Sequence, residues 1–280
     1  MNLPIFTKLP GAVAIDLDGT LLNSHTQLSE RNRIALEKCM ERGIPIIIAT
    51  SRSERATRRV IGNDLANTCS LVMANGANAH GRTPLSGLVR ETIPAAVAKD
   101  IVELTLKTEF AVRVTVEIDG FDFDFGYNDT PEQLRELNSA TPGMVISIDE
   151  AIARIPNKIS VKGFGRDLSA VVNKISENFG SVISVFPSDN GTFLNIVNNR
   201  TSKTAALRKL LSSQTIPLNN VIAFGDDLPD MEMLQACGIP VAMANSFPEV
   251  KAACLYQTAS NDEDGVAMVL EKMLADILEV

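Results

Sequence analysis

Two carboxylates separated by a single residue follow the first apolar run of the sequence. Asp16 and Asp18 belong to the segment Asp16–Thr20 (DLDGT), and the apolar run Gly11–Leu17 predicts a buried strand that leads into it. In open parallel sheets, ligands bind at the carboxyl ends of the strands. Carboxylates held this close repel each other, so they are either neutralised by a cation or partly protonated. Asp and Gly are also common turn residues, which leaves a plain turn as the alternative.

A second group of acidic residues follows another predicted strand, Val221–Phe224 (VIAF). The segment Gly225–Asp230 (GDDLPD) brings three carboxylates to what should be the same sheet edge. Asp227 also suits a turn and Asp230 a helix start, whereas Asp226 has no comparable structural role. Five acidic residues at one edge with no histidine beside them indicate oxygen ligands for a hard cation, which suits Mg²⁺ better than zinc.

A hydroxyl pair and a lysine complete the set. Thr50 and Ser51 follow the apolar run Ile44–Ala49, where a hydroxyl and backbone N–H groups can hold an anion, although simple N-capping fits equally well. Lys203 opens the predicted helix Ser202–Leu211, where a cation opposes the helix dipole unless an anion lies beside it; an exposed lysine is the alternative. Together, the four signals supply the groups needed to transfer a phosphoryl group through an aspartyl-phosphate.

These motifs occur in the order seen in the haloacid dehalogenase superfamily. The chain resembles the phosphatases of that superfamily, in the Cof-type group with a large α+β cap, and the resemblance spans nearly its whole length. The motifs that carry it are Asp16–Thr20, Thr50, Lys203 and Asp226–Asp230, together with Asn75–Ala77 (NGA), Val241–Asn245 (VAMAN) and Ser260–Val266 (SNDEDGV).

The resemblance implies roles for the acidic residues. Asp16 is expected to be the nucleophile that takes the phosphoryl group and also a Mg²⁺ ligand. Asp18 is expected to protonate the leaving oxygen and then activate the hydrolytic water, with its backbone carbonyl on the metal. Asp226 is expected to bind Mg²⁺ directly, Asp230 to support the metal shell and Asp227 to reach it through water.

The resemblance also implies a phosphate site. The N–H groups of Leu17 and Ser51 and the side chain of Thr50 are expected to hold the phosphoryl oxygens, and Lys203 to neutralise the nucleophile and the phosphate. Two residues depart from the usual pattern: Ser51 replaces a glycine, and Pro229 replaces an asparagine that often contacts phosphate. We expect activity to survive, because the nucleophile, the second aspartate, the lysine and the metal-binding acids are present.

The elements that must position these residues alternate in type at both ends of the chain. Strand, helix, strand, helix, strand predicts a parallel sheet with right-handed crossovers, and therefore an α/β, Rossmann-like core. The expected strands are 11–17, 44–49, 70–75, 221–224 and 241–244, and the expected helices are 28–42, 53–65, 202–211, 229–236 and 264–278.

The middle of the chain follows a different pattern. Helix 94–108 precedes a predicted hairpin formed by 111–118 and 121–127, and helix 167–178 precedes another formed by 181–186 and 192–197. Two helix–hairpin units indicate an α+β insertion rather than more parallel sheet. We therefore expect residues 1–82 and 199–280 to form the catalytic core and residues 83–198 to form an inserted α+β cap domain that sets substrate specificity.

Composition argues against several classes of protein. A net charge of −8, no Trp and two Tyr argue against nucleic-acid binding. No apolar run approaches the ~20 residues of a membrane span, and no signal peptide is evident. The four cysteines lack CxxC spacing, as expected of buried thiols in a reducing compartment. These patterns predict a soluble cytoplasmic protein and leave its oligomeric state open.

The function expected from these observations is that of a Mg²⁺-dependent phosphatase acting on small phosphorylated metabolites. Sugar phosphates are the first expectation, and nucleotide or cofactor phosphates the second. A phosphomutase with the same catalytic groups is one alternative, and a non-catalytic phospho-acceptor or metabolite-sensing protein is another. Asp18 argues against a dehalogenase, because dehalogenases of the superfamily lack this second acid.

Overall fold

The computed structural model describes residues 1–120, 125–127 and 142–278, and these form two compact units. Unit 1 comprises Met1–Thr50, Val60–Val89 and Lys203–Val280, and unit 2 comprises Ser51–Arg59 and Arg90–Ser202. The main divisions lie between Val89 and Arg90 and between Ser202 and Lys203, and the core of residues 1–82 and 199–280 with a cap of residues 83–198 stays a prediction. Ser51–Arg59 makes its contacts with unit 2, which the sequence pattern does not predict.

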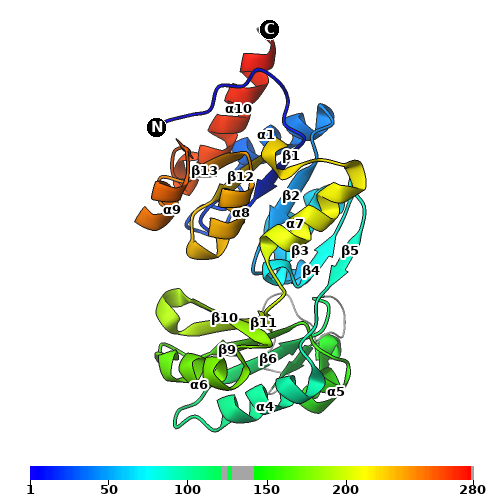
Figure 1. The fold of residues 1–280 in the computed structure, drawn as a ribbon, viewed down its shortest axis with the longest axis vertical. Helices are drawn as coiled ribbons and strands as arrows, with labels where there is room; N and C mark the ends of the chain where they lie inside the picture. The colour runs from blue at the N-terminus through cyan, green and yellow to red at the C-terminus, as the bar shows by residue number, and fades with distance from the viewer. Residues whose placement is uncertain (121–124, 128–141, 279–280) are drawn as a thin grey trace. The chain divides into compact units, whose positions relative to one another are not determined.

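Unit 1 is built on an eight-stranded, mostly parallel sheet with the order β14-β13-β12-β1-β2-β3-β4-β5 (Figure 1). The two short strands β4 and β5 form one edge, and β4 runs antiparallel to β3. The central strands are apolar along their whole length because helices cover both faces of the sheet. The strands are β1 Ala12–Ile15, β2 Ile46–Ala49, β3 Ser70–Met73, β4 Asn78–His80, β5 Leu88–Arg90, β12 Val221–Gly225, β13 Ile239–Ala242 and β14 Tyr256–Gln257.

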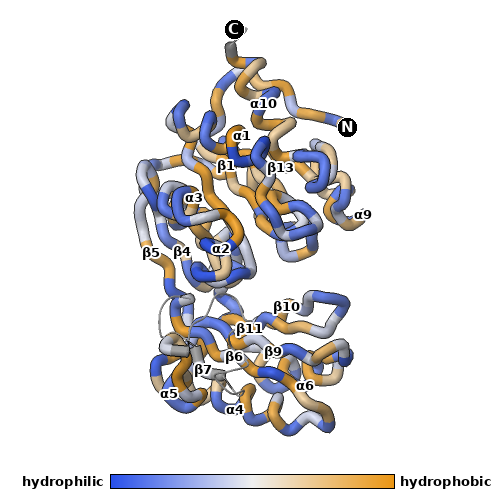
Figure 2. Tube along the Cα trace, turned by 180° about the vertical axis from the view of Figure 1, so that it is seen from behind, coloured by the Kyte–Doolittle hydropathy of each residue, from blue (hydrophilic) through white to orange (hydrophobic). Residues whose placement is uncertain are grey.

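Alternate residues of β1 contribute to two cores. Val13 and Ile15 pack with helices α1, α3 and α10 on one face, and Ala12 and Ala14 pack with α7, α8 and α9 on the other. Figure 2 shows the same pattern, with hydrophobic residues along the central strands and hydrophilic residues in many of the turns. The helices are α1 Glu30–Glu41, α3 Asn63–Thr68, α7 Lys203–Leu211, α8 Met231–Ala236, α9 Pro248–Ala253 and α10 Gly265–Leu278.

The expected elements of unit 1 are present, with two corrections. The single helix expected over 53–65 is two helices, α2 Glu54–Ile61 and α3, because the chain turns at Gly62 with φ of 82°. The helix expected over 229–236 begins with a separate 3₁₀ turn, Leu228–Asp230. Ser29 caps α1 as expected, since its side chain accepts a hydrogen bond from the N–H of Asn32.

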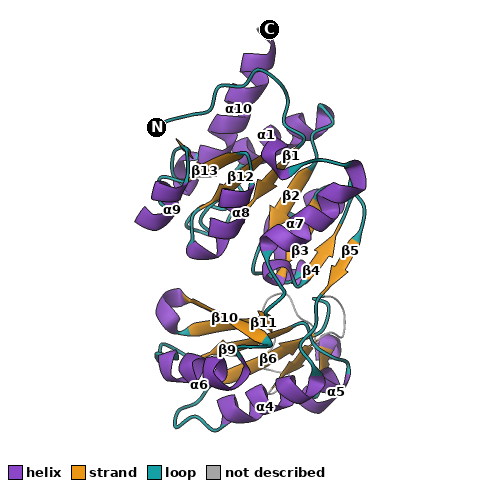
Figure 3. Ribbon diagram, in the orientation of Figure 1, coloured by secondary structure: helices purple, strands orange, loops and turns teal. Residues whose placement is uncertain are grey.

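Unit 2 is an α+β unit with a six-stranded sheet in the order β10-β11-β9-β6-β7-β8 (Figure 3). Helices α4 Ala95–Leu106, α5 Ile148–Ala153 and α6 Ser169–Phe179 share an apolar core with it. Part of the strand expected over 121–127 lies outside the described residues, and β7 spans Phe125–Tyr127. The other strands are β6 Arg113–Glu117, β8 Val145–Ile146, β9 Lys158–Lys162, β10 Ile183–Ser188 and β11 Phe193–Asn198. None of the described helices has the length and apolar character needed to cross a membrane.

Candidate active site

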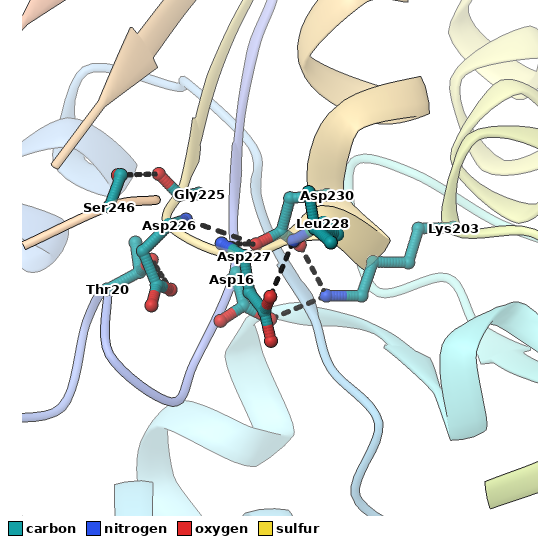
Figure 4. A network of polar contacts seen from close by, with 9 residues as sticks. All are labelled: Asp16, Thr20, Lys203, Gly225, Asp226, Asp227, Leu228, Asp230 and Ser246. Atoms are coloured by element: carbon teal, nitrogen blue, oxygen red, sulfur yellow. Dashed lines mark hydrogen bonds and ion pairs between the residues drawn. The ribbon is translucent and has the colours of Figure 1, made fainter. Parts of the chain in front are cut away.

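The two acid-bearing turns leave neighbouring strands at the same edge of the unit 1 sheet. β1 and β12 are parallel partners, with Ile15 opposite Phe224, and the N–H of Asp16 donates to the carbonyl of Phe224 at 3.0 Å. Asp16 and Asp226 therefore follow directly from adjacent strand ends. Asp16, Asp226 and Asp230 each present a carboxylate oxygen within 4.8 Å of the others (Figure 4).

Lys203 lies between two of these carboxylates. It is the first residue of α7, and its Nζ donates to Oδ1 of Asp16 and Oδ1 of Asp230, both at 2.6 Å. All three side chains are less than 10% exposed. Burial opposes the charge of Lys203, but the two carboxylates outweigh it and raise the lysine pKa above its ordinary value.

The pKa of Asp16 is set by its burial and by the charged groups around it. Burial raises its pKa well above the ordinary value, and the nearby carboxylates of Asp230 and Asp226 add to the effect, while Lys203 opposes it. A divalent cation beside these oxygens would favour the carboxylate form that a nucleophile needs.

Asp230 supports the site through both carboxylate oxygens. Oδ1 accepts from Lys203, while Oδ2 accepts from the N–H groups of Asp226 at 3.1 Å and Asp227 at 3.2 Å. The chain passes so close here that a Cβ on Gly225 would lie 2.6 Å from Cβ of Asp230. Asp230 thus shapes the turn and holds the lysine at the same time.

Thr20 and Gly19 position Asp226, and the sequence pattern gave neither residue a role. Thr20 is fully buried, and its Oγ1 donates to Oδ1 of Asp226 at 2.7 Å. Gly19 has φ of 79°, and a Cβ there would lie 2.3 Å from Oδ2 of Asp226. Burial raises the pKa of Asp226 to about 7. In the sequence, a Gly followed by a small polar Thr within an acidic turn was the feature that could have indicated a role for both residues.

Leu17 and Asp18 lie in the tight turn that follows β1. Leu17 is fully buried, and its carbonyl accepts from the N–H groups of Leu21 at 3.1 Å and Leu22 at 2.9 Å. Asp18 is exposed, and it forms an isolated β-bridge with Leu22. The structure therefore places Asp18 two residues beyond Asp16 in a closed turn, with its side chain accessible to a ligand.

Thr50 directly follows β2, the other neighbour of β1 in the sheet. Its N–H donates to the carbonyl of Val72 at 2.8 Å, and its carbonyl accepts from the N–H of Asn75 at 3.0 Å. Ser51 follows, and its carbonyl accepts from Nζ of Lys158 at 3.0 Å, a contact inside unit 2. Burial lowers the pKa of Lys158. Thr50 thus follows a strand at the same sheet edge as Asp16 and Asp226.

The charges of the site fit a divalent cation. Three carboxylates and one ammonium group sum to −2 when all are ionised (−3 + 1), and the described part of the chain supplies only carboxylates to the three-residue cluster. Hard oxygen ligands of this kind favour Mg²⁺ and similar cations. Asp16 and Asp226 are the direct candidates for ligands, because both oxygens of Asp230 already accept protein hydrogen bonds.

Comparison with known proteins identifies relatives that match nearly the whole chain. A 5-amino-6-(5-phospho-D-ribitylamino)uracil phosphatase of Bacillus subtilis, YitU, is 27% identical over 271 residues, covering 94% of this chain and 97% of the relative. The B. subtilis phosphatase YwpJ is 28% identical over 292 residues, covering 94% and 99% of the two chains. The crystal structure of TM0651 from Thermotoga maritima matches with a TM-score of 0.77 and 28% identity, over 95% of this chain and 97% of that chain.

Other structures support the fold alone. The subclass IIB sugar phosphatase BT4131 matches with a TM-score of 0.74 at 20% identity, over 93% of this chain and 97% of that chain. The family model of haloacid dehalogenase-like hydrolases matches residues 13–270, a range that includes both acid-bearing turns, Thr50 and Lys203. The protein therefore belongs to the family of haloacid dehalogenase-like hydrolases.

Proposed function

We propose that the protein is a Mg²⁺-dependent phosphatase that hydrolyses small phosphorylated metabolites through an aspartyl-phosphate on Asp16. The observation that carries the proposal is the buried lysine between Asp16 and Asp230, with Asp226 close by. This arrangement keeps one carboxylate at a strand end beside positive charge, as nucleophilic attack on a phosphorylated substrate requires.

In the first step, an oxygen of Asp16 attacks the phosphorus atom and the bond from phosphorus to the leaving oxygen breaks. Asp18, accessible at the same turn, donates a proton to the leaving oxygen, so the product departs as a neutral alcohol. Lys203 offsets the negative charge gathered on Asp16 and the phosphoryl group. Thr50 and the N–H groups of Leu17 and Ser51 hold the phosphoryl oxygens in this proposal.

In the second step, water attacks the phosphorus atom and the bond to Asp16 breaks. Asp18, now ionised, takes a proton from that water, which returns both aspartates to their starting forms and releases inorganic phosphate. When bound by Asp16, Asp226 and the backbone carbonyl of Asp18, Mg²⁺ would neutralise charge on the phosphoryl oxygens. Asp230 keeps Lys203 in place throughout both steps.

The substrate we propose has a hydroxyl-rich leaving group, with sugar phosphates first and nucleotide or cofactor phosphates second. The names of the relatives, a ribitylaminouracil phosphatase and a sugar phosphatase, agree with such a substrate.

The test is phosphate release from a panel of sugar phosphates, nucleotides, FMN, pyridoxal phosphate and a phosphorylated ribitylaminopyrimidine. Each assay is run with Mg²⁺ and with EDTA, with Asp16→Asn as the control. We expect release that needs Mg²⁺ and is lost in Asp16→Asn. Interconversion of sugar 1- and 6-phosphates without net release would instead identify a mutase, and a phosphoenzyme that persists for minutes would identify a phospho-acceptor.

A further inference from the structure

A short segment after β13 holds the turn that carries Asp226. Ser246 is buried, and its Oγ donates to the carbonyl of Gly225 at 3.3 Å, a contact drawn in Figure 4. The N–H of Phe247 donates to the carbonyl of Asp226 at 3.1 Å. Residues 245–247, called the brace below, therefore bind the first two carbonyls of the second acid-bearing turn.

The first residue of the brace reaches the other acid-bearing turn. Nδ2 of Asn245 donates to the carbonyl of Gly19 at 2.7 Å, across 226 residues of sequence. Its Oδ1 accepts from the N–H of Asn261 at 3.0 Å, and Nδ2 of Asn261 donates to the carbonyl of Leu22 at 2.8 Å. Both ends of the Asn245 amide are thus engaged, and its partner Asn261 binds the far end of the same turn.

The carbonyl that Asn245 holds is next to the proposed acid and base. Asp18 is exposed, and the backbone of this turn carries its side chain. Gly19 adopts φ of 79°, a conformation that an external hydrogen bond to its carbonyl can hold. Thr20, the next residue, is tied to Asp226. Two contacts therefore hold the short segment 18–20: the hydrogen bond from Asn245 of the brace to Gly19, and the hydrogen bond from Thr20 to Asp226.

We propose that Asn245 is a positioning residue for Asp18: its amide orients the Gly19 peptide so that the Asp18 carboxylate reaches the leaving oxygen and, later, the hydrolytic water. The motif Val241–Asn245 stood out in the sequence without a role, and this contact gives it one. The inference rests on the proposed function, because it assigns Asn245 to proton transfers by Asp18. Asn245 itself makes no contact with the reacting groups in this scheme.

The test compares Asn245→Ala and Asn245→Asp with wild type on two substrates in Mg²⁺. Asn245→Asp keeps an oxygen for the Asn261 N–H and loses the donor to Gly19. With an alkyl phosphate, the leaving oxygen needs a proton, so we expect kcat to fall about 10- to 100-fold with little change in KM. With p-nitrophenyl phosphate, the first step needs no proton, so we expect rapid mixing to show a p-nitrophenol burst at the wild-type rate, followed by slow turnover.

A matched control is Asn199→Ala. Asn199 is an exposed asparagine of unit 2 whose Nδ2 also donates to a backbone carbonyl, that of Ser181, at 2.6 Å. We expect this variant to retain wild-type rates on both substrates. Equal losses of burst and steady-state rates in Asn245→Ala would indicate general damage and overturn the positioning role, as would wild-type kinetics in both Asn245 variants.

Amide hydrogen exchange separates this inference from the proposed function. In metal-free protein, we expect peptides covering residues 17–22 to exchange faster in Asn245→Ala than in wild type, whether or not any substrate is turned over. If the wild-type protein is inactive but the variant still exchanges faster, the result counts against the proposed phosphatase activity and supports the contacts of the brace. Active wild type with unchanged exchange and unchanged kinetics would count against the brace alone.

Discussion

Replacing Lys203 with Met should strongly destabilise the metal-free protein. The substitution removes the Lys203 ammonium group, which contacts Asp16 and Asp230, both at 2.6 Å, and leaves the two carboxylates in a site where their side chains are 9% and 1% exposed. Removing one partner of a buried charge pair costs about 3–5 kcal/mol, because the remaining charge stays buried without compensation. We therefore expect Lys203→Met to lower the free energy of unfolding by about that amount at pH 7.5 in EDTA.

A second substitution should recover part of this loss. Asp230→Asn removes one of the two stranded carboxylates, so the double variant should be more stable than the sum of the single changes, with a coupling free energy of about 1–3 kcal/mol. Lys209→Met is the matched control: Lys209 lies on the same helix with an exposed side chain. We expect it to change stability by less than about 0.5 kcal/mol.

Urea unfolding followed by circular dichroism is the assay, since the chain contains no Trp to report on unfolding by fluorescence. Mg²⁺ should stabilise Lys203→Met by a larger margin than wild type, because the cation takes over part of the missing charge. A loss below about 1 kcal/mol in the single variant, or a double variant no more stable than Lys203→Met, would show that the lysine does not hold the carboxylates in this way.

Two further outcomes are expected. In metal-free protein, the raised pKa of Asp226 contributes stability that is fully present below about pH 4 and is lost as pH rises through about 7. We therefore expect Mg²⁺ to raise the Tm more at pH 8 than at pH 6. An equal rise in Tm at the two pH values would contradict this reasoning. Gly19→Ala should weaken Mg²⁺ binding measured by calorimetry, because its Cβ would lie 2.3 Å from an oxygen of Asp226, whereas Gly43→Ala, with nothing within 4 Å, should not.

The sheet of unit 1 was predictable because its central strands are covered on both faces. Such strands read as continuous apolar runs, and two of the runs here lead directly into residues of the site, at Asp16 and Thr50. The break between α2 and α3 was not predictable from spacing, since the apolar pattern continues through Gly62. The short edge strands β4 and β5 also escaped prediction, because three residues are too few to show an alternation.

The acidic residues of the site were predictable, and the bonds that orient them were not. Parallel strands bring their carboxyl ends together, so the meeting of Asp16 with Asp226 follows from the order of the elements. By contrast, Thr20 contacts Asp226 across 206 residues and Asn245 contacts Gly19 across 226. A hydrogen bond between such distant residues leaves no periodic pattern in the chain, so only the folded arrangement reveals it.

The position of β1 in the sheet sets the order in which the protein can be completed on the ribosome. β1 pairs with β2 on one side and with β12 on the other, and Ala12 lies opposite Val221. While residues after the first eighty are still being synthesised, the edge of β1 that β12 will cover lacks its partner, and its N–H and C=O groups are open to pairing with other chains. That edge stays unpaired throughout the synthesis of unit 2, and the second acid-bearing turn joins the site only after β12 has been made and paired with β1.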